Sequence, residues 1–180
     1  MYCVNMVRFI DTLKLKHLEA VAKEKFGEMG VRIFRMLLLR GQLEQKQVSD
    51  CAMIPARDTR ETLYRMLTSG FVFMQDIPKT ADRAPTRTFY TWRSDWAVTC
   101  DRFAVELYRA AGNVWARLQH EMQRARQLLD LIEEATDLGK LTFSITPAQR
   151  SQLQRLNTVS QVLDAGLMQM DDSIALFNTF

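Results

Sequence analysis

The chain has 180 residues, of which 47% are hydrophobic and 25% are charged, and its formal net charge at pH 7 is +3. Only 7 residues are Gly and 4 are Pro, which argues against a β-sandwich and against long disordered segments. No run of about 18 apolar residues occurs, so we expect no membrane span, and the N-terminus lacks the features of a secretory signal.

The charge is unevenly distributed along the chain. Residues 1–126 carry 21 Lys and Arg against 14 Asp and Glu, whereas residues 127–180 carry 3 against 7. The first part therefore suits a polyanionic partner and the second does not. Chance and a need for solubility explain this asymmetry equally well.

The cysteines and histidines give no sign of a disulfide or a metal. Cys3, Cys51 and Cys100 are odd in number and far apart, which is typical of a reducing compartment. We expect Cys51 to pack in a core. His17 and His120 are the only histidines and neither lies near a cysteine, so we expect no metal site and no cofactor.

Helical periodicity dominates the first 70 residues. A helix broken near Asp11–Thr12 is expected up to Gly27, and a second helix is expected over residues 28–40 with Gly41 just past its end. Residues 42–54 predict a short third helix. A fourth is predicted to begin with Pro55 at its first position and to end at Gly70.

Two apolar runs then predict a β-hairpin, with strands over about residues 71–77 and 86–92. Three short helices followed by a two-stranded hairpin are the element order of a winged helix, a helix-turn-helix fold with a β wing. The residues between the strands are too many for a tight turn, since hairpin loops commonly need two to five. They are also rich in Pro, Thr, Lys and Arg.

After Trp96 the pattern changes to heptads. One apolar stripe runs from Ala104 to Ala135 with Glu121 as its only polar member, and a second runs from Leu153 to Phe177. Thr146 and Pro147 predict the start of the second helix. Alternating spacings of three and four residues over four heptads predict a coiled coil, which most simply folds as an antiparallel hairpin of two continuous helices. The alternative is two core helices of a bundle. The predicted fold class is therefore mainly α, with residues 1–95 as a helical lead-in and winged helix and residues 96–180 as the coiled-coil hairpin.

Catalytic motifs are missing from the sequence, since it contains no nucleophile elbow, phosphate-binding loop or zinc-protease motif. Nucleic-acid contact is better supported, because phosphate recognition needs only cations on a surface that follows the backbone. The candidate DNA-binding residues lie on the fourth helix and on the hairpin tip: Arg57, Arg60, Arg65, Lys79, Arg83 and Arg87. The alternative is a winged helix that binds protein, with these cations solvated or paired.

Three stretches carry a resemblance to a known family: "LEQKQVSD", "AMIPARDTRETLYRML" and "QDIPKTADRAPTRTFY". With the residues around them, they resemble the last winged-helix module of a family specific to RNA polymerase III. Each member of this family is the large subunit of a three-protein subcomplex of that enzyme. The family is related to the alpha chain of general factor II E. The heptad region occupies the place of the family's coiled coil. The chain has room for one complete module and looks like the C-terminal part of the family pattern.

The resemblance implies a nuclear, non-catalytic subunit of a DNA-directed RNA polymerase. Such a protein would contact single- or double-stranded DNA, its heterotrimer partners and the clamp of the largest subunit, in promoter opening and transcription initiation. The first alternative is a free-standing winged-helix repressor that dimerises through its C-terminal coil. The second is an assembly scaffold that does not touch nucleic acid.

Overall fold

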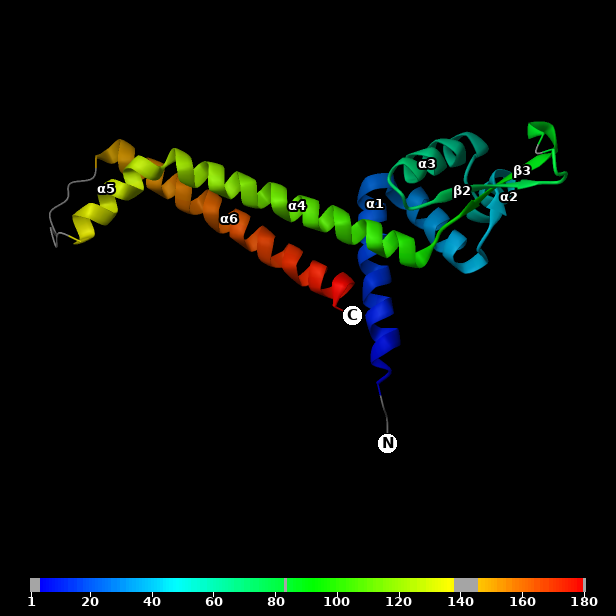
Figure 1. Ribbon diagram of the computed structural model, residues 1–180, viewed down its shortest axis with the longest axis horizontal. Coiled ribbons are helices and arrows are strands. Elements are labelled where there is room, and N and C mark those ends of the chain that lie inside the picture. The colour runs from blue at the N-terminus through cyan, green and yellow to red at the C-terminus, as the bar shows by residue number, and fades with distance from the viewer. Residues whose placement is uncertain (1–3, 83, 138–145, 180) are drawn as a thin grey trace. The chain divides into compact units, whose positions relative to one another are not determined.

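The computed structural model describes residues 4–82, 84–137 and 146–179. Ten elements follow one another along these described residues, and they form two compact units, one within residues 1–104 and the other within residues 105–179. Figure 1 labels the helices and the two hairpin strands. The winged-helix fold is confirmed in the first unit. The domain boundary expected between residues 95 and 96 stays a prediction. Among the described helices, none combines the length and hydropathy needed to cross a bilayer.

The first helix, α1 (Met6–Arg40), is longer than expected. The break predicted near Asp11–Thr12 is wrong, because the Thr12 hydroxyl donates a 2.7 Å hydrogen bond to the Arg8 carbonyl inside a continuous helix. Gly27 does interrupt the helix: its φ of 74° lies in the region that favours glycine, and α1 changes direction there. Gly41, with φ of 76°, ends the helix as predicted, and its N–H donates to the Leu37 carbonyl at 2.9 Å.

Two short helices pack against the second half of α1. They are α2 (Gln45–Ala52) and α3 (Ala56–Thr68), and Pro55 is the cap of α3 rather than its first residue. The prediction that Cys51 is buried is wrong. In the two turns of α2, Val48 and Ala52 face inward, and Cys51 is left exposed on the other side. The side chains that are inaccessible to solvent form one core: Leu18, Ile33, Phe34, Leu37, Val48, Leu63, Met66 and Val72.

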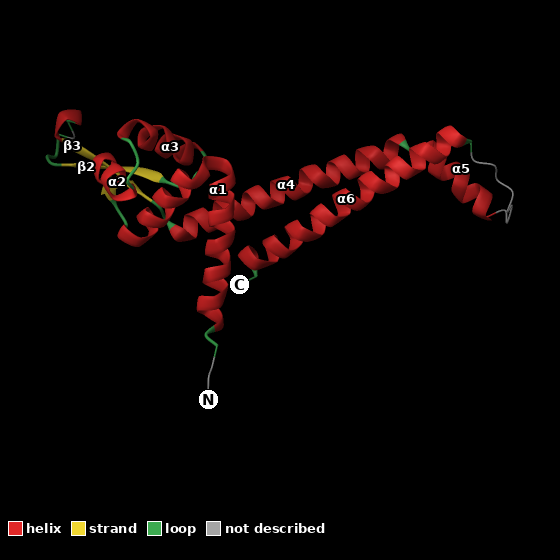
Figure 2. Cartoon of the chain, turned by 180° about the vertical axis from the view of Figure 1, so that it is seen from behind, coloured by secondary structure: helices red, strands yellow, loops and turns green. Residues whose placement is uncertain are grey.

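Among the described residues, the sheet has three antiparallel strands rather than the two predicted. Figure 2 shows the sheet in yellow beside the helices. The hairpin consists of β2 (Phe73–Pro78) and β3 (Thr88–Arg93), with Asp76 opposite Tyr90 and Ile77 opposite Phe89. The additional strand, β1 (Leu43–Glu44), pairs with the other edge of β3. It was not predicted because two residues are too few to show a periodicity.

The second unit contains α5 (Arg126–Asp137), α6 (Pro147–Asn178) and most of α4 (Trp96–Arg124). The start of α6 is as predicted, since Thr146 and Gln149 cap one another reciprocally. The expectation of one continuous first helix is wrong, because a turn at Ala125 separates α4 from α5. The segment between α5 and α6, whose sequence includes a β-like stretch, lies outside the described residues.

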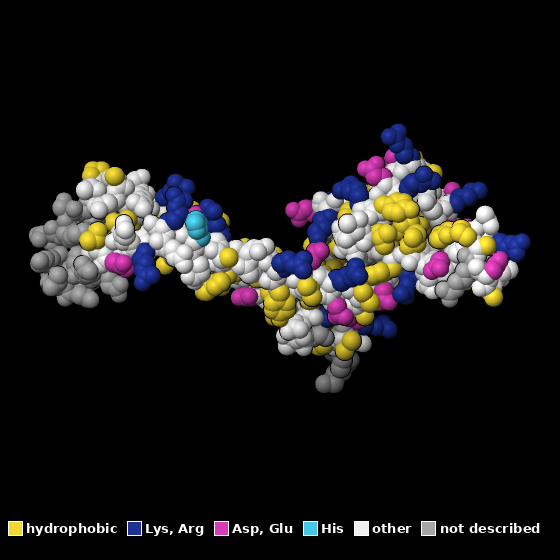
Figure 3. All heavy atoms as spheres, turned by 45° about the horizontal axis from the view of Figure 1, so that its top comes forward, with side chains coloured by type: hydrophobic (Ala, Val, Ile, Leu, Met, Phe, Trp, Pro, Cys, Tyr) yellow, Lys and Arg dark blue, Asp and Glu magenta, His cyan; other side chains and the backbone are white. Residues whose placement is uncertain are grey.

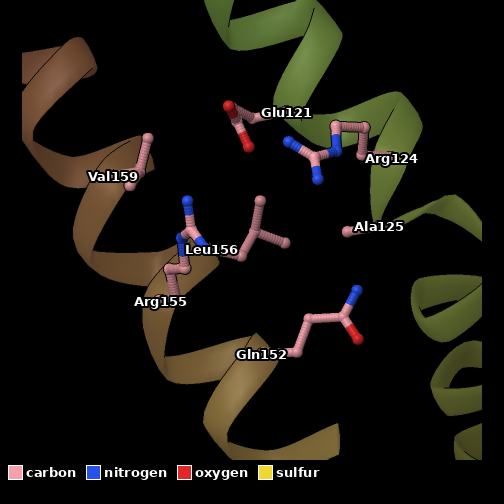
Figure 4. Close-up of a pocket in the computed structure, with 7 residues that line it drawn as sticks. All are labelled: Glu121, Arg124, Ala125, Gln152, Arg155, Leu156 and Val159. Carbon is pink, nitrogen blue, oxygen red and sulfur yellow. The ribbon is translucent and has the colours of Figure 1, made fainter.

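The helices α4 and α6 lie side by side and antiparallel (Figure 1). Side chains of both line a cavity of about 70 Å³ around Leu156 (Figure 4). The amide of Asn178 donates to the Tyr108 hydroxyl at 3.2 Å. Where they are described, the side chains at the predicted heptad positions are all buried or half-buried. The most buried of them are Leu118, Ala125, Leu128 and Leu156. Glu121, the polar member of the stripe, pairs with Arg117 at 2.6 Å. Coiled-coil interdigitation itself stays a prediction.

An ion pair joins the two halves of α1. Glu19 is only 7% exposed, and the Arg35 guanidinium donates to both of its carboxylate oxygens, at 2.5 and 2.7 Å. These hydrogen bonds are the main reason why the pKa of Glu19 lies below its usual value, against the opposing effect of burial. Because the two residues lie on opposite sides of Gly27, the pair fixes the direction that α1 takes after the kink.

We predict that Leu156→Ala destabilises the helix pair by about 2–4 kcal/mol, because it leaves a space between α4 and α6. Val162→Ala on the same helix is the matched control. Val162 is 67% exposed, so its loss should change the free energy of unfolding by less than about 0.5 kcal/mol. Chemical denaturation followed by circular dichroism measures both variants. Equal effects of the two substitutions would contradict the pairing face.

We also predict that Glu19→Gln costs about 1–2 kcal/mol at pH 7, the typical contribution of hydrogen bonds to a charged group when one partner stays exposed. The folded pKa of Glu19 is lowered from 4.5, so the stabilisation is present above that value and is lost as the pH falls through the folded pKa. The free energy of unfolding is measured by denaturation at pH 7 and at steps down to about pH 3. The difference in this free energy between the wild type and the variant should become smaller as the pH falls. A difference in unfolding free energy that stays constant with pH would contradict the prediction. The control is Glu24→Gln, at an exposed residue of the same helix.

Candidate nucleic-acid interface

The exposed face of α3 carries two of the predicted cations. Thr59, Thr62, Leu63 and Met66 are buried, so the opposite side of the helix faces solvent. Arg57 and Arg60 lie on that side, and neither forms an ion pair with another described residue. Tyr64 follows one turn after Arg60 and is 50% exposed. The side of α3 that would enter a groove therefore presents two guanidinium groups and an aromatic ring, with the exposed Glu61 between them.

Arg65 is held apart from this face. Its Nη2 atom donates a 2.7 Å hydrogen bond to the Lys25 carbonyl, and its guanidinium lies 5.9 Å from the centre of the Phe26 ring. Both partners belong to α1, just before the Gly27 kink. The structure thus gives Arg65 a role in joining α3 to α1, which accounts for this arginine without any nucleic acid.

The described residues at the two ends of the wing loop are hydrogen-bonded to one another. The Lys79 N–H donates to the Arg87 carbonyl at 2.9 Å, and a single 3-10 turn, η1 (Pro85–Arg87), leads into β3. The Thr88 hydroxyl and the Arg87 N–H both donate to the Ala84 carbonyl at 2.9 Å. The backbone hydrogen bond between Lys79 and Arg87 brings these two residues together at the base of the loop. Arg83 lies outside the described residues.

The side chain of Lys79 has an aromatic neighbour. Its Nζ atom lies 4.2 Å from the centre of the Phe89 ring, an arrangement in which the cation is attracted by the ring face. Phe89 is 42% exposed and Tyr90, on the other face of the hairpin, is 48% exposed. The wing therefore presents aromatic surface as well as charge.

Sequence reasoning did not single out these aromatic residues. The signal was present for Tyr64, which is four residues after Arg60 and seven after Arg57 and so shares their helical face. For Tyr90 no such signal existed, because the strand alternates imperfectly and either side could have been the buried one. Tyr64 also packs edge-on against the buried Trp92 of β3, with ring centres 5.5 Å apart, and this contact ties α3 to the wing.

The surface around these residues is mixed in charge. Figure 3 shows basic side chains spread over the winged-helix part, with acidic ones between them and an apolar cluster among them. Within the described part of the chain, no three His, Cys, Asp or Glu side chains gather as a metal site would require. Scattered cations of this kind are sufficient for contact with a phosphate backbone, which needs no fixed pattern of side chains.

Comparison with known proteins gives consistent matches. Residues 18–94 match the family model described as the C-terminal winged-helix domain of POLR3C. The chain is 37% identical to DNA-directed RNA polymerase III subunit RPC3 of Danio rerio and 34% identical to that of Homo sapiens, in each case over 100% of this chain and 36% of the relative. The protein of that name from Dictyostelium discoideum is 29% identical over 99% of this chain and 26% of the relative.

The matches agree with the resemblance seen in the sequence, which also included the heptad region. The chain spans about a third of the length of the curated relatives from animals. The family match begins at Leu18 and ends just after β3, so it coincides with the core of the winged helix. The chain therefore contains a winged-helix domain of the POLR3C C-terminal family over residues 18–94, and over its whole length it is similar to RNA polymerase III subunit RPC3.

Proposed function

We propose that this chain acts as a non-catalytic part of RNA polymerase III, contacting DNA and neighbouring subunits in promoter opening and transcription initiation in the nucleus. The observation that carries the proposal is the alignment of the whole chain with proteins named as subunits of that enzyme. In this proposal phosphodiester chemistry belongs to other subunits, and the chain supplies positioning and charge.

The DNA-facing surface in this proposal consists of α3 and the wing. Arg57 and Arg60 contribute from α3, and Lys79, Arg83 and Arg87 contribute from the wing. Pro78 and Pro85 at the two ends of the loop each fix their own φ, and this limits how far the loop can collapse. A stiff loop with three cations contacts phosphates without reading bases, which suits an enzyme subunit that acts at many promoters.

The helix pair is the proposed contact to neighbouring subunits, which are the heterotrimer partners and the clamp of the largest subunit. Residues 127–180 carry 3 Lys and Arg against 7 Asp and Glu, so repulsion from phosphates disfavours DNA contact there. The alternative of a repressor that dimerises through its coil needs the heptad faces to pair between two chains. In the structure α4 and α6 pair within one chain, which supports the polymerase role over the repressor.

The test is a salt titration of DNA binding by the variant Lys79→Ala/Arg83→Ala/Arg87→Ala. If all three cations contact phosphates, the slope of log K against log salt should fall by about 2–3, and affinity should fall alike for unrelated sequences. The substituted side chains that are described lie on the surface, so stability should change by less than about 0.5 kcal/mol each. Duplex and pre-melted DNA are the two ligands, with the polymerase subcomplex as the protein if the chain alone binds too weakly.

A control of equal charge separates local contact from net charge. Arg109, Arg124 and Arg150 are exposed on α4 and α6, and changing all three to Ala removes the same charge elsewhere on the chain. This control should leave the salt slope of the wild type nearly unchanged. A slope equally reduced in both triple variants, or unchanged in the wing variant, would mean that the wing does not face DNA.

A further inference from the structure

A groove lies on the winged-helix unit between the C-terminal half of α1 and the end of α2. It has a volume of about 520 Å³ and is lined by Arg32, Arg35, Met36, Leu39, Arg40, Cys51, Ala52 and Met53. No residue of α3 or of the wing contributes to it. The groove is therefore built from other elements than the proposed DNA-facing surface, and it can be altered separately.

The apolar part of the groove is unusually exposed. Leu39 is 87% and Met53 is 83% exposed, which makes them the two most exposed large hydrophobic residues in the described part of the chain. Single apolar residues on a surface need no explanation, but adjacent ones that line one groove are a feature of docking sites. Methionines add to this, because the flexible side chains of Met36 and Met53 can adapt to different partner shapes.

The backbone at Met53, which ends α2, adopts a conformation that is unfavourable for a methionine. Its φ of 54° and ψ of 46° lie in the left-handed region, and it is the only residue other than glycine with positive φ among the described residues. Asn or Gly would adopt this conformation more readily. The fold of the unit does not require an exposed Met at the turn between α2 and α3. An apolar contact with a binding partner would account for a methionine at this position.

The rim of the groove is positively charged. It carries three arginines, and none of the eight lining residues is acidic. Arg35 is held in place by Glu19 at 2.5 Å, while Arg32 and Arg40 form no ion pair with another described residue. An occupant of this groove has to bring negative charge for the rim and apolar side chains for Leu39 and Met53.

We propose that the groove docks an acidic amphipathic helix of another protein chain. Such a helix would place its apolar residues, spaced three and four apart, against Met36, Leu39 and Met53, with its carboxylates toward Arg32 and Arg40. A phosphate backbone would satisfy the arginines but would leave the two exposed apolar side chains without partners, so nucleic acid is the weaker fit. Complementary charge at the rim also increases the rate of encounter with an acidic partner.

The probe is a fluorescein-labelled amphipathic peptide of about 18 residues, long enough to be helical in isolation, with Leu on one face and Glu on its flanks. Fluorescence anisotropy with the full 180-residue chain should give saturable binding with a Kd below about 100 μM. A peptide with the same composition but scrambled order, and one with Lys in place of Glu, should both bind at least about tenfold more weakly.

Two variants of the chain locate the site. Leu39→Asp and Arg40→Glu should each weaken binding of the acidic peptide by about tenfold or more, and Arg40→Glu should improve binding of the Lys peptide. The matched control is Val7→Asp, which places the same charge at a 70% exposed apolar residue of α1 outside the groove. It should leave the Kd within about twofold of the wild type. Circular dichroism checks that all three variants fold.

Four results would overturn the proposal. One is the absence of saturable binding by the acidic peptide, and another is an equal loss in Val7→Asp. The third is displacement of the peptide by duplex or single-stranded DNA, with DNA affinity lost in Leu39→Asp, since the groove would then take nucleic acid. The fourth is self-association in analytical ultracentrifugation that Leu39→Asp abolishes, since the occupant would then be a second copy of the chain.

Discussion

The winged-helix unit depends on the position of one aromatic side chain, Phe71. Its ring packs edge-on against Phe26 and Phe34, with ring centres 5.5 and 5.6 Å away, so it contacts α1 on both sides of the Gly27 kink. Phe71 follows Gly70, whose φ of 77° lets the chain turn out of α3 and start the wing. Contacts of this kind are stabilising beyond the area that they bury. This side chain therefore packs both segments of α1 against the start of the wing, beside the Glu19–Arg35 pair that also links them.

Because the core is built around α1, the outer faces of the unit are left for separate uses. The core sides of α2 and α3 are covered, so α3 and the wing each present cations and aromatic rings to solvent. The groove between α1 and α2 presents a different chemistry, with exposed apolar side chains beside three arginines. Arg35 contributes both to the fold, through Glu19, and to that rim. A single small core thus leaves two separate surfaces of different chemistry exposed.

Most of the correct predictions of helix and strand positions came from hydrophobic periodicity and from the residues that end helices. Gly27, Gly41 and Gly70 all have positive φ where helices were expected to end, because such conformations are unfavourable for other residues. Thr146 and Pro147 likewise marked the start of α6. The wrong predictions concern positions where the local sequence is compatible with more than one structure. Thr12 can satisfy its hydroxyl within a helix, Cys51 could have faced either way in a two-turn helix, and β1 is too short to show a pattern.

The sequence by itself determined the fold class, the wing and the heptad faces, because these follow from spacings along the chain that water and backbone sterics enforce locally. It also identified the cations that could meet a phosphate backbone. Only the tertiary structure decided which of them are available. It placed Arg65 on the Lys25 carbonyl, while it left Arg57 and Arg60 exposed. The reason is physical: a hydrogen bond between residues 40 positions apart exists only once the helices that carry them have packed.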